Sequence, residues 1–136
     1  MMIDALVITH GDVGRELVHV VEMILGPVEG LSALTNSGKS VQDLTTEIRE
    51  ALAASPDGTD NPSLLFIDDF GGSCANAAQF AMAEGAKAQI LTGVNLAMLL
   101  DYVTWRDSMA AGELSRRLVE KGREAIIRLS PGQEDE

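Results

Sequence analysis

Apolar and polar positions along the chain follow a pattern that favours short strands alternating with amphipathic helices. The runs Ala5–Ile8 and Leu64–Ile67 are apolar without interruption, as in strands of a parallel sheet that are covered on both faces. Weaker apolar runs at Leu31–Leu34 and Gln89–Leu91 predict two further strands, and Ala125–Leu129 predicts a final one. This alternation predicts an α/β fold with a doubly wound, mostly parallel sheet flanked by helices.

Five segments space their apolar residues as amphipathic helices do. They begin near Asp12, after Ser40, after Ser73, at Leu96 and at Glu113, and the last two end at Trp105 and Glu124. Ser40 is a suitable N-cap for the second helix. In the third helix we expect Ala77, Phe80 and Ala81 to face inward, and we expect Arg106 to lie at a solvated helix end. The stretch 55–62 is a loop by composition.

Length and charge narrow the class of protein. The 136 residues fit one domain, for which we expect the bounds 1–130, followed by an acidic disordered tail at 131–136. The net charge of −11 argues against nucleic acid and anionic membrane surfaces as partners. Cys74 is the only cysteine, which excludes an intrachain disulfide and suits a reducing cytoplasm. No apolar run approaches the roughly 20 residues of a membrane-spanning helix, so we expect a cytoplasmic protein without membrane insertion.

The candidate catalytic residues lie where the two most clearly predicted strands end. His10 follows the first strand, and Asp68 follows the strand Leu64–Ile67. Ligands of open α/β sheets bind at the carboxyl ends of strands, and in a common doubly wound order these two strands are neighbours. A carboxylate that accepts one imidazole N–H leaves the other nitrogen free to attack. The sequence therefore predicts a catalytic pair made of His10 and Asp68.

Gly71, Gly72 and Ser73 open the helix that follows Asp68. Glycines let the backbone approach a ligand closely, and the free N–H groups of a helix start favour a phosphate or another anion. Ser73 can cap the helix, donate its hydroxyl to the anion, or do both. Together with His10, these residues favour a phosphohistidine site, because phosphoryl transfer needs mainly positioning and charge stabilisation.

Other interpretations stay open at the level of residue types. A histidine at a strand end is often structural, and an aspartate before a helix is often a cap. A receiver-like signalling domain is disfavoured, because Thr9 and His10 stand where such domains need acidic residues. A metal hydrolase that uses His10, Asp68 and Asp69 lacks a recognisable ligand spacing, so we expect no metal and no cofactor.

Four motifs along the chain resemble those of a known family. They are Thr9–Gly11, Glu22–Gly26, Phe66–Ala78 and Gly93–Leu99. As a set, they are similar to the mannose-type EIIA family, the phosphocarriers of the bacterial phosphoenolpyruvate-dependent sugar phosphotransferase system. The resemblance spans most of the chain and implies an α/β sandwich. It also implies a homodimer, in which the carboxyl-terminal strand is exchanged between subunits as an antiparallel edge strand.

Residue by residue, the resemblance implies a phosphotransferase in which His10 accepts a phosphoryl group from phosphorylated HPr and passes it to an EIIB partner. Asp68 matches the aspartate that orients the histidine, and Gly71, Gly72 and Ser73 match the loop that lines the phosphate. An alternative is a regulatory EIIA-like protein, in which the phosphorylation state of His10 controls a binding partner without sugar transport.

Three residues near the site depart from the family pattern. Cys74 stands where proline is usual, Asp69 stands where an uncharged residue is usual, and Asp12 adds a carboxylate close to His10. An inward-pointing carboxylate would repel a phosphoryl dianion by about 1 kcal/mol or more. We therefore expect Asp12 and Asp69 to point to solvent; the alternative is that they tune the rate of transfer and the choice of partner. We expect Cys74 to be a partly buried residue at the helix start.

Overall fold

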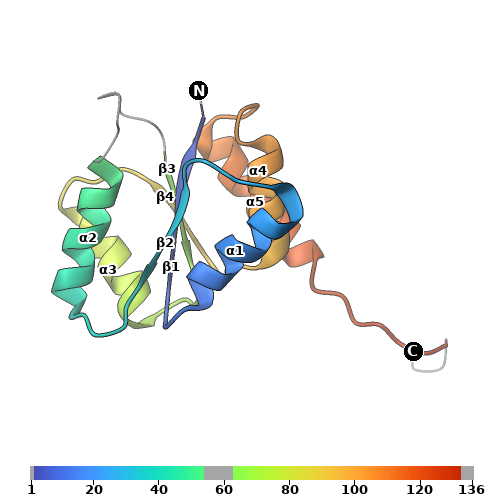
Figure 1. The fold of residues 1–136 in the computed structure, drawn as a ribbon, viewed down its shortest axis with the longest axis horizontal. Coiled ribbons are helices and arrows are strands. Elements are labelled where there is room, and N and C mark those ends of the chain that lie inside the picture. The colour runs from blue at the N-terminus through green and yellow to red at the C-terminus, as the bar shows by residue number, and fades with distance from the viewer. Residues whose placement is uncertain (1, 54–62, 133–136) are drawn as a thin grey trace.

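A four-stranded parallel sheet forms the centre of the described chain (Figure 1). The computed structural model describes residues 2–53 and 63–132, so the loop predicted at 55–62 lies outside the described residues. The strands are β1 (Asp4–Thr9), β2 (Leu31–Thr35), β3 (Ser63–Ile67) and β4 (Gln89–Thr92). They lie in the order β2-β1-β3-β4, and every pairing is parallel. The predicted doubly wound sheet is confirmed, and its switch point lies between β1 and β3.

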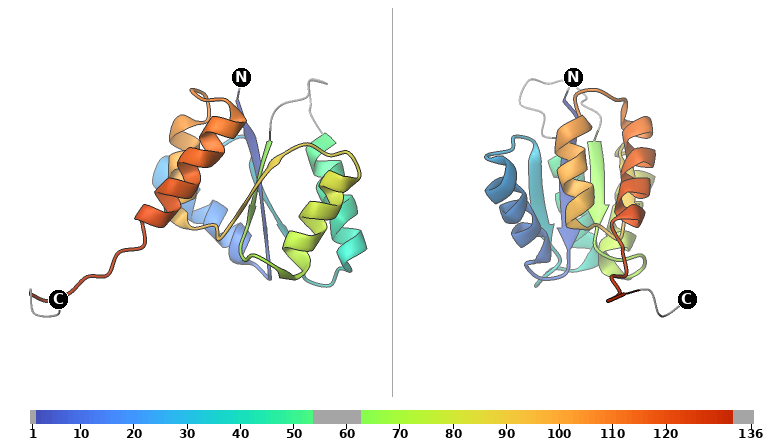
Figure 2. Two further views of the ribbon diagram at one scale, coloured as in Figure 1. Left: turned by 180° about the vertical axis from the view of Figure 1, so that it is seen from behind. Right: turned by 90° about the vertical axis from the view of Figure 1, so that its right-hand side faces the viewer.

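Helices cover both faces of this sheet. On one face lie α1 (Val13–Leu25), α4 (Leu96–Trp105) and α5 (Ala111–Glu124), and on the other lie α2 (Val41–Ala53) and α3 (Gly72–Ala83) (Figures 1 and 2). Val7 and Phe66 belong to the core on the α1, α4 and α5 side, whereas Ile8 and Ile67 belong to the core on the α2 and α3 side. Because β1 and β3 are buried on both faces, their apolar runs show no alternation.

Polar side chains fix where two of the helices begin. Ser40 Oγ accepts the backbone N–H of Asp43 at 3.0 Å, which confirms Ser40 as the N-cap of α2. At α1, the hydroxyl of the buried Thr9 accepts the backbone N–H of Gly14 at 2.7 Å. This bond ties the last residue of β1 to the first turn of α1. It thereby holds the short loop that carries His10.

The inward face of α3 is predicted correctly for Ala77 and Ala81, which are buried, and wrongly for Phe80, which is 53% exposed. The buried residues Cys74, Ala77, Ala78 and Ala81 follow the i, i+3, i+4, i+7 spacing of one helix face. Phe80 lies outside that face. Small side chains line the buried face, and the large ring is left at the surface.

Arg106 is also predicted wrongly, because its side chain is buried rather than solvated. Its Nη1 donates to the carbonyl of Glu29 at 2.6 Å and to the hydroxyl of Tyr102 at 3.1 Å. Tyr102 in turn donates to the carbonyl of Ile3 at 2.5 Å. Burial raises the pKa of Tyr102 to about 12, although the hydrogen bond and the charge of Arg106 act in the opposite direction. This network ties α4 to the start of β1 and to the connection between α1 and β2.

After α5 the chain extends away from the sheet and the helices (Figures 1 and 2). The described residues 125–132 contain neither strand nor helix, so the strand predicted at Ala125–Leu129 does not form within a single chain. Its exchange in a dimer stays a prediction. The predicted tail at 131–136 is described only for its first two residues. Among the helices in the described ranges, none has the length and apolar character needed to cross a membrane.

Candidate functional site

The carboxyl ends of β1 and β3 bring His10 and Asp68 to the same edge of the sheet. These strands pair in parallel, with Ile8 opposite Ile67, and both isoleucines are fully buried. The chain leaves the sheet just beyond this pair, at His10 on one strand and at Asp68 on the other. Two segments that are 58 residues apart in the sequence therefore meet at the switch point.

One carboxylate oxygen of Asp68 contacts His10 twice. Asp68 Oδ2 accepts the backbone N–H of His10 at 2.9 Å and lies 2.9 Å from the imidazole Nδ1. The His10 side chain is 55% exposed and the Asp68 side chain 20%. Because an ionised carboxylate can only accept, Nδ1 carries the proton of the neutral ring and Nε2 holds the lone pair. The predicted approach of these two groups is confirmed.

The surroundings of Asp68 keep its carboxyl group ionised. Burial raises the pKa of Asp68, but several interactions lower it: the hydrogen bonds from the backbone and ring of His10, the charge of His10, and the backbone N–H of Asp68 itself. These interactions together outweigh burial, so the pKa lies below its usual value. A charged Asp68 can both fix the tautomer of His10 and stabilise positive charge that develops on its ring.

The amino terminus of α3 lies beside the imidazole. Gly71 and Gly72 have φ angles of 93° and 80°, a region that strains residues with a side chain. A Cβ added to Gly72 would lie 3.9 Å from His10 Nε2, so the loop passes close to the nitrogen that holds the lone pair. No side chain in the described part of the protein caps α3, and the first N–H groups of a helix have no intrahelical partner. These N–H groups can bind an anion attached to Nε2.

Asn36, just beyond β2, joins the candidate site although the sequence pattern did not single it out. Its Oδ1 accepts the backbone N–H of Gly11 at 3.3 Å, and its Nδ2 donates to Ser73 Oγ at 3.1 Å. Asn36 thus links the loop after His10 to the start of α3. Because Ser73 Oγ accepts this bond, its own proton can be donated to a bound anion. The sequence offers only a weak signal for Asn36, a polar residue at the end of a predicted strand.

The two extra carboxylates near His10 are exposed to solvent. The Asp12 side chain is 71% exposed and lies 3.7 Å from the guanidinium of Arg15. Asp69 is exposed as well. The expectation that both face solvent is confirmed, and water screens the charge of an exposed carboxylate.

Cys74 lies in the first turn of α3 and is fully buried, more deeply than expected. Burial and the charge of Asp68 raise the pKa of its thiol, and a hydrogen bond with Ser73 acts weakly in the opposite direction. Cys74 is therefore a neutral thiol at ordinary pH, next to the charged member of the pair.

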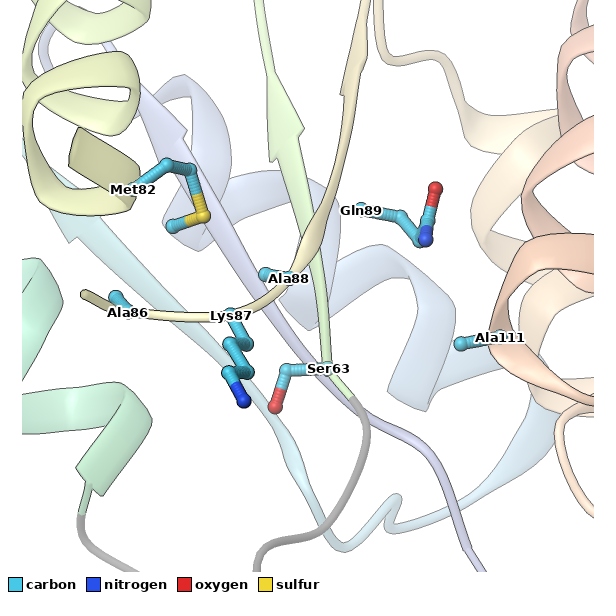
Figure 3. A pocket seen from close by; sticks show the side chains of 7 residues that line it. All are labelled: Ser63, Met82, Ala86, Lys87, Ala88, Gln89 and Ala111. Carbon is cyan, nitrogen blue, oxygen red and sulfur yellow. The ribbon is translucent and has the colours of Figure 1, made fainter.

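An open pocket lies at the other end of the sheet, near the starts of β3 and β4 (Figure 3). It is lined by Ser63, Met82, Ala86, Lys87, Ala88, Gln89 and Ala111. Lys87 supplies its one charged side chain, and the lining contains neither imidazole nor carboxylate. This pocket has none of the groups found at the carboxyl ends of β1 and β3.

The groups around His10 form a coherent chemical set. Nε2 is a nucleophile with its lone pair available, Asp68 compensates positive charge on the ring, and the start of α3 offers donors to an anion. Such a set supports the transfer of an anionic group to the imidazole and its later release to another acceptor.

Comparison with known proteins points in the same direction. The sequence model of the EIIA-man family, described as the PTS system fructose IIA component, matches residues 4–119. The fructose-specific EIIA component of Bacillus subtilis (strain 168) is 31% identical over 118 residues, which cover 86% of this chain and 80% of that protein. The mannose-specific EIIAB component of Escherichia coli (strain K12) is 30% identical over 128 residues, 93% of this chain. This chain spans 39% of the length of the Escherichia coli protein.

Solved structures share the fold. EIIA from Streptococcus agalactiae superposes with a TM-score of 0.83 at 22% identity, covering 93% of this chain and 97% of that one. The mannose/sorbose-specific IIA subunit from Enterococcus faecalis gives a TM-score of 0.78 at 21% identity, covering 99% of this chain and 100% of that one. At these sequence identities, the similarity to the two solved structures shows a shared fold.

Proposed function

Because the chain belongs to the mannose-type EIIA family and has a role in the sugar phosphotransferase system, we propose that it is a phosphocarrier whose His10 accepts and passes on a phosphoryl group. The observation that carries the proposal is the single Asp68 oxygen that contacts both the backbone N–H and the Nδ1 of His10. It leaves Nε2 as the only ring nitrogen with a lone pair.

In the proposed reaction, Nε2 of His10 attacks the phosphorus of the phosphohistidine on HPr. A new N–P bond forms on His10, and the N–P bond to HPr breaks, so that the HPr imidazole keeps the electron pair. His10 Nδ1 retains its proton, which leaves positive charge on the ring beside Asp68. Transfer to EIIB repeats these events in reverse, with an EIIB side chain as the attacking group.

The start of α3 supports the phosphoryl group in this proposal. The backbone N–H groups of its first turn have no partner within the helix, and the helix dipole favours negative charge there. The hydroxyl of Ser73 adds one donor, which Asn36 orients by donating to the same oxygen. These donors stabilise an anion in the transition state without reorganisation.

HPr and EIIB are the proposed protein partners, and the proposed location is the cytoplasm. The printed name of the Escherichia coli relative joins an A and a B component, which supports an EIIB partner for this chain. Phe70 and Val13 are 79% and 53% exposed and lie within three residues of Asp68 and His10 in the sequence. Exposed apolar side chains next to the nucleophile suit a docking protein better than a small free substrate. The regulatory alternative uses the same chemistry and stays a prediction.

We also propose that the protein is a homodimer formed by exchange of residues 125–129. β4 pairs only with β3 in the described chain, so its outer edge has unpaired backbone groups. A groove of about 410 Å³ runs beside β4, between that strand, the start of α4 and the end of α5. Ile126, Ile127 and Leu129 are 80%, 70% and 89% exposed, which is costly for apolar side chains in water. A partner's segment laid along β4 would cover both features.

Phosphorylation in a reconstituted system tests the carrier proposal. The protein is incubated with phosphoenolpyruvate, enzyme I and HPr, and the label should be acid-labile and alkali-stable. The chain has two histidines, so His19→Ala on the exposed side of α1 is a matched control for His10→Ala. We expect labelling of the wild type and of His19→Ala and none of His10→Ala. Equal labelling of the two variants would contradict the proposal.

A further inference from the structure

Three side chains of types that commonly bind metals lie together at the site, each on a separate segment of the chain. His10 follows β1, Asp68 follows β3, and Cys74 lies in the first turn of α3. One ligand atom from each, an imidazole nitrogen, a carboxylate oxygen and the thiol sulfur, lies within 4.8 Å of the other two. The phosphocarrier chemistry described above uses His10 and Asp68 but gives Cys74 no task.

The second oxygen of Asp68 is available to a ligand. Oδ2 accepts both hydrogen bonds from His10, whereas Oδ1 is buried and has no hydrogen-bond partner among the described residues. A buried carboxylate oxygen without a partner is unfavourable unless something satisfies it. A cation would satisfy Oδ1 and leave the bond from the His10 backbone N–H to Oδ2 intact.

We propose that His10, Asp68 and Cys74 form a binding site for Zn²⁺. The N, O and S donor set matches the preferences of zinc, whereas magnesium and calcium prefer oxygen ligands alone. Zinc binds these donors at about 2.0–2.3 Å, which places ligand atoms roughly 3.3–3.7 Å apart. Small side-chain rotations bring atoms that already lie within 4.8 Å to this separation. A water molecule fills the fourth position.

Binding is balanced by the release of one proton. The thiol of Cys74 loses its proton to solvent and binds as a thiolate, and Asp68 binds as the carboxylate that it already is. The neutral imidazole binds through one nitrogen and keeps its single proton on the other. No oxidant or second reactant is needed.

The site gives the proposed carrier a metal-dependent switch. A neutral imidazole has one lone pair, so a ring that binds Zn²⁺ through either nitrogen has none left to attack phosphorus. Zinc binding and phosphorylation of His10 are therefore mutually exclusive. The switch rests on the proposed function, whereas the binding itself does not, and the two can be tested separately.

Metal binding is measured first, with no phosphoryl donor present. The purified full chain is titrated with Zn²⁺ and with Co²⁺, and Cys74→Ser is the matched variant because it changes one atom of the side chain. We expect one metal per chain, one proton released, and a near-ultraviolet thiolate-to-Co²⁺ charge-transfer band. Cys74→Ser should lose the band and bind Zn²⁺ at least about 10-fold more weakly. Absence of stoichiometric binding, or equal binding by the variant, would overturn the site.

Phosphoryl transfer is measured second. Purified phospho-HPr is mixed with wild type or Cys74→Ser in a single turnover, with Zn²⁺ or with a chelator. With chelator both proteins should react at the same rate, and Zn²⁺ should slow the wild type at least about 10-fold more than the variant. Equal slowing of both proteins would show that the metal acts elsewhere and would overturn the switch. Failure of both to react with chelator would contradict the carrier function and leave the result of the titration unchanged.

Discussion

Replacing Asp68 by asparagine isolates the charge of the carboxylate from its hydrogen bonds. Both His10 donors meet the same atom, Oδ2, at 2.9 Å. The amide oxygen of an asparagine can take that place and accept both bonds, so Nδ1 stays protonated and Nε2 keeps its lone pair. The amide nitrogen then occupies the position of Oδ1. What the variant loses is the negative charge beside the ring.

The magnitude follows from the geometry of the pair. When Nε2 accepts the phosphoryl group, the ring becomes positive while its Nδ1 lies 2.9 Å from Asp68 Oδ2, so the two delocalised charges are roughly 4 Å apart. Their attraction is about 1 kcal/mol at the dielectric of water and about 4 kcal/mol at a typical protein surface. Because His10 is 55% exposed, screening favours the lower part of this range, about 1–2 kcal/mol. Transfer should therefore slow about 10-fold, since 1.4 kcal/mol corresponds to a factor of ten.

Rapid-quench measurement of single-turnover transfer from phospho-HPr gives the rate directly. Asp68→Ala serves as the comparison, because it also removes the acceptor for both His10 donors and should be slower than Asp68→Asn. Circular dichroism and urea unfolding establish that both variants are folded. A folded Asp68→Asn that transfers at the wild-type rate would refute the role of the charge.

The same variant has a consequence for acid stability. The folded-state pKa of Asp68 lies below its usual value, so ionisation of this group stabilises the fold above about pH 4 and the contribution is lost as pH falls through the folded pKa. Between pH 5 and about pH 2, the free energy of unfolding of Asp68→Asn should fall less than that of the wild type. Urea unfolding across this range measures the difference, and identical slopes for both proteins would contradict the shift.

Three further predictions test the surroundings of the site and the assembly. Asn36→Ala should slow transfer about 2- to 10-fold by releasing the hydroxyl of Ser73, and its effect should be less than additive with Ser73→Ala in a double-mutant cycle. Tyr102→Phe leaves a buried carbonyl and a buried guanidinium without their shared partner, so urea unfolding should show a loss of about 1–3 kcal/mol. Ile127→Lys should convert the proposed dimer to a monomer in analytical ultracentrifugation. Phe80→Lys, which changes an exposed apolar position on α3, should leave the protein dimeric. A dimer that survives Ile127→Lys would contradict the exchange.

The elements that the sequence predicts well are those whose pattern depends on burial alone. β1 and β3 lie in the middle of the sheet, so their uninterrupted apolar runs identify them and also place His10 and Asp68 at its carboxyl edge. Predicting the contact between these two residues required one further assumption, namely that β1 and β3 are neighbours in the sheet. The observed order β2-β1-β3-β4 confirms this assumption.

Residues whose position depends on distant partners could not be predicted in the same way. Arg106 is buried because the carbonyl of Glu29, 77 residues away, accepts from it. Asn36 enters the site through Ser73, 37 residues away, on an element that follows a different strand. Neither partner is visible in the local pattern. The prediction for Phe80 was wrong for another reason. α3 is apolar around most of its circumference, so the spacing of its apolar residues in the sequence does not single out one buried face.

The proposed phosphocarrier function is tested most sharply by determining which nitrogen of His10 carries the phosphoryl group. Protein labelled with ¹⁵N in its histidine rings is phosphorylated through enzyme I and HPr, and the coupling between ³¹P and ¹⁵N is then recorded by NMR. Because Asp68 Oδ2 holds the proton on Nδ1, we expect phosphorus on Nε2 of His10. Phosphorus on Nδ1, or on any other residue, would contradict it.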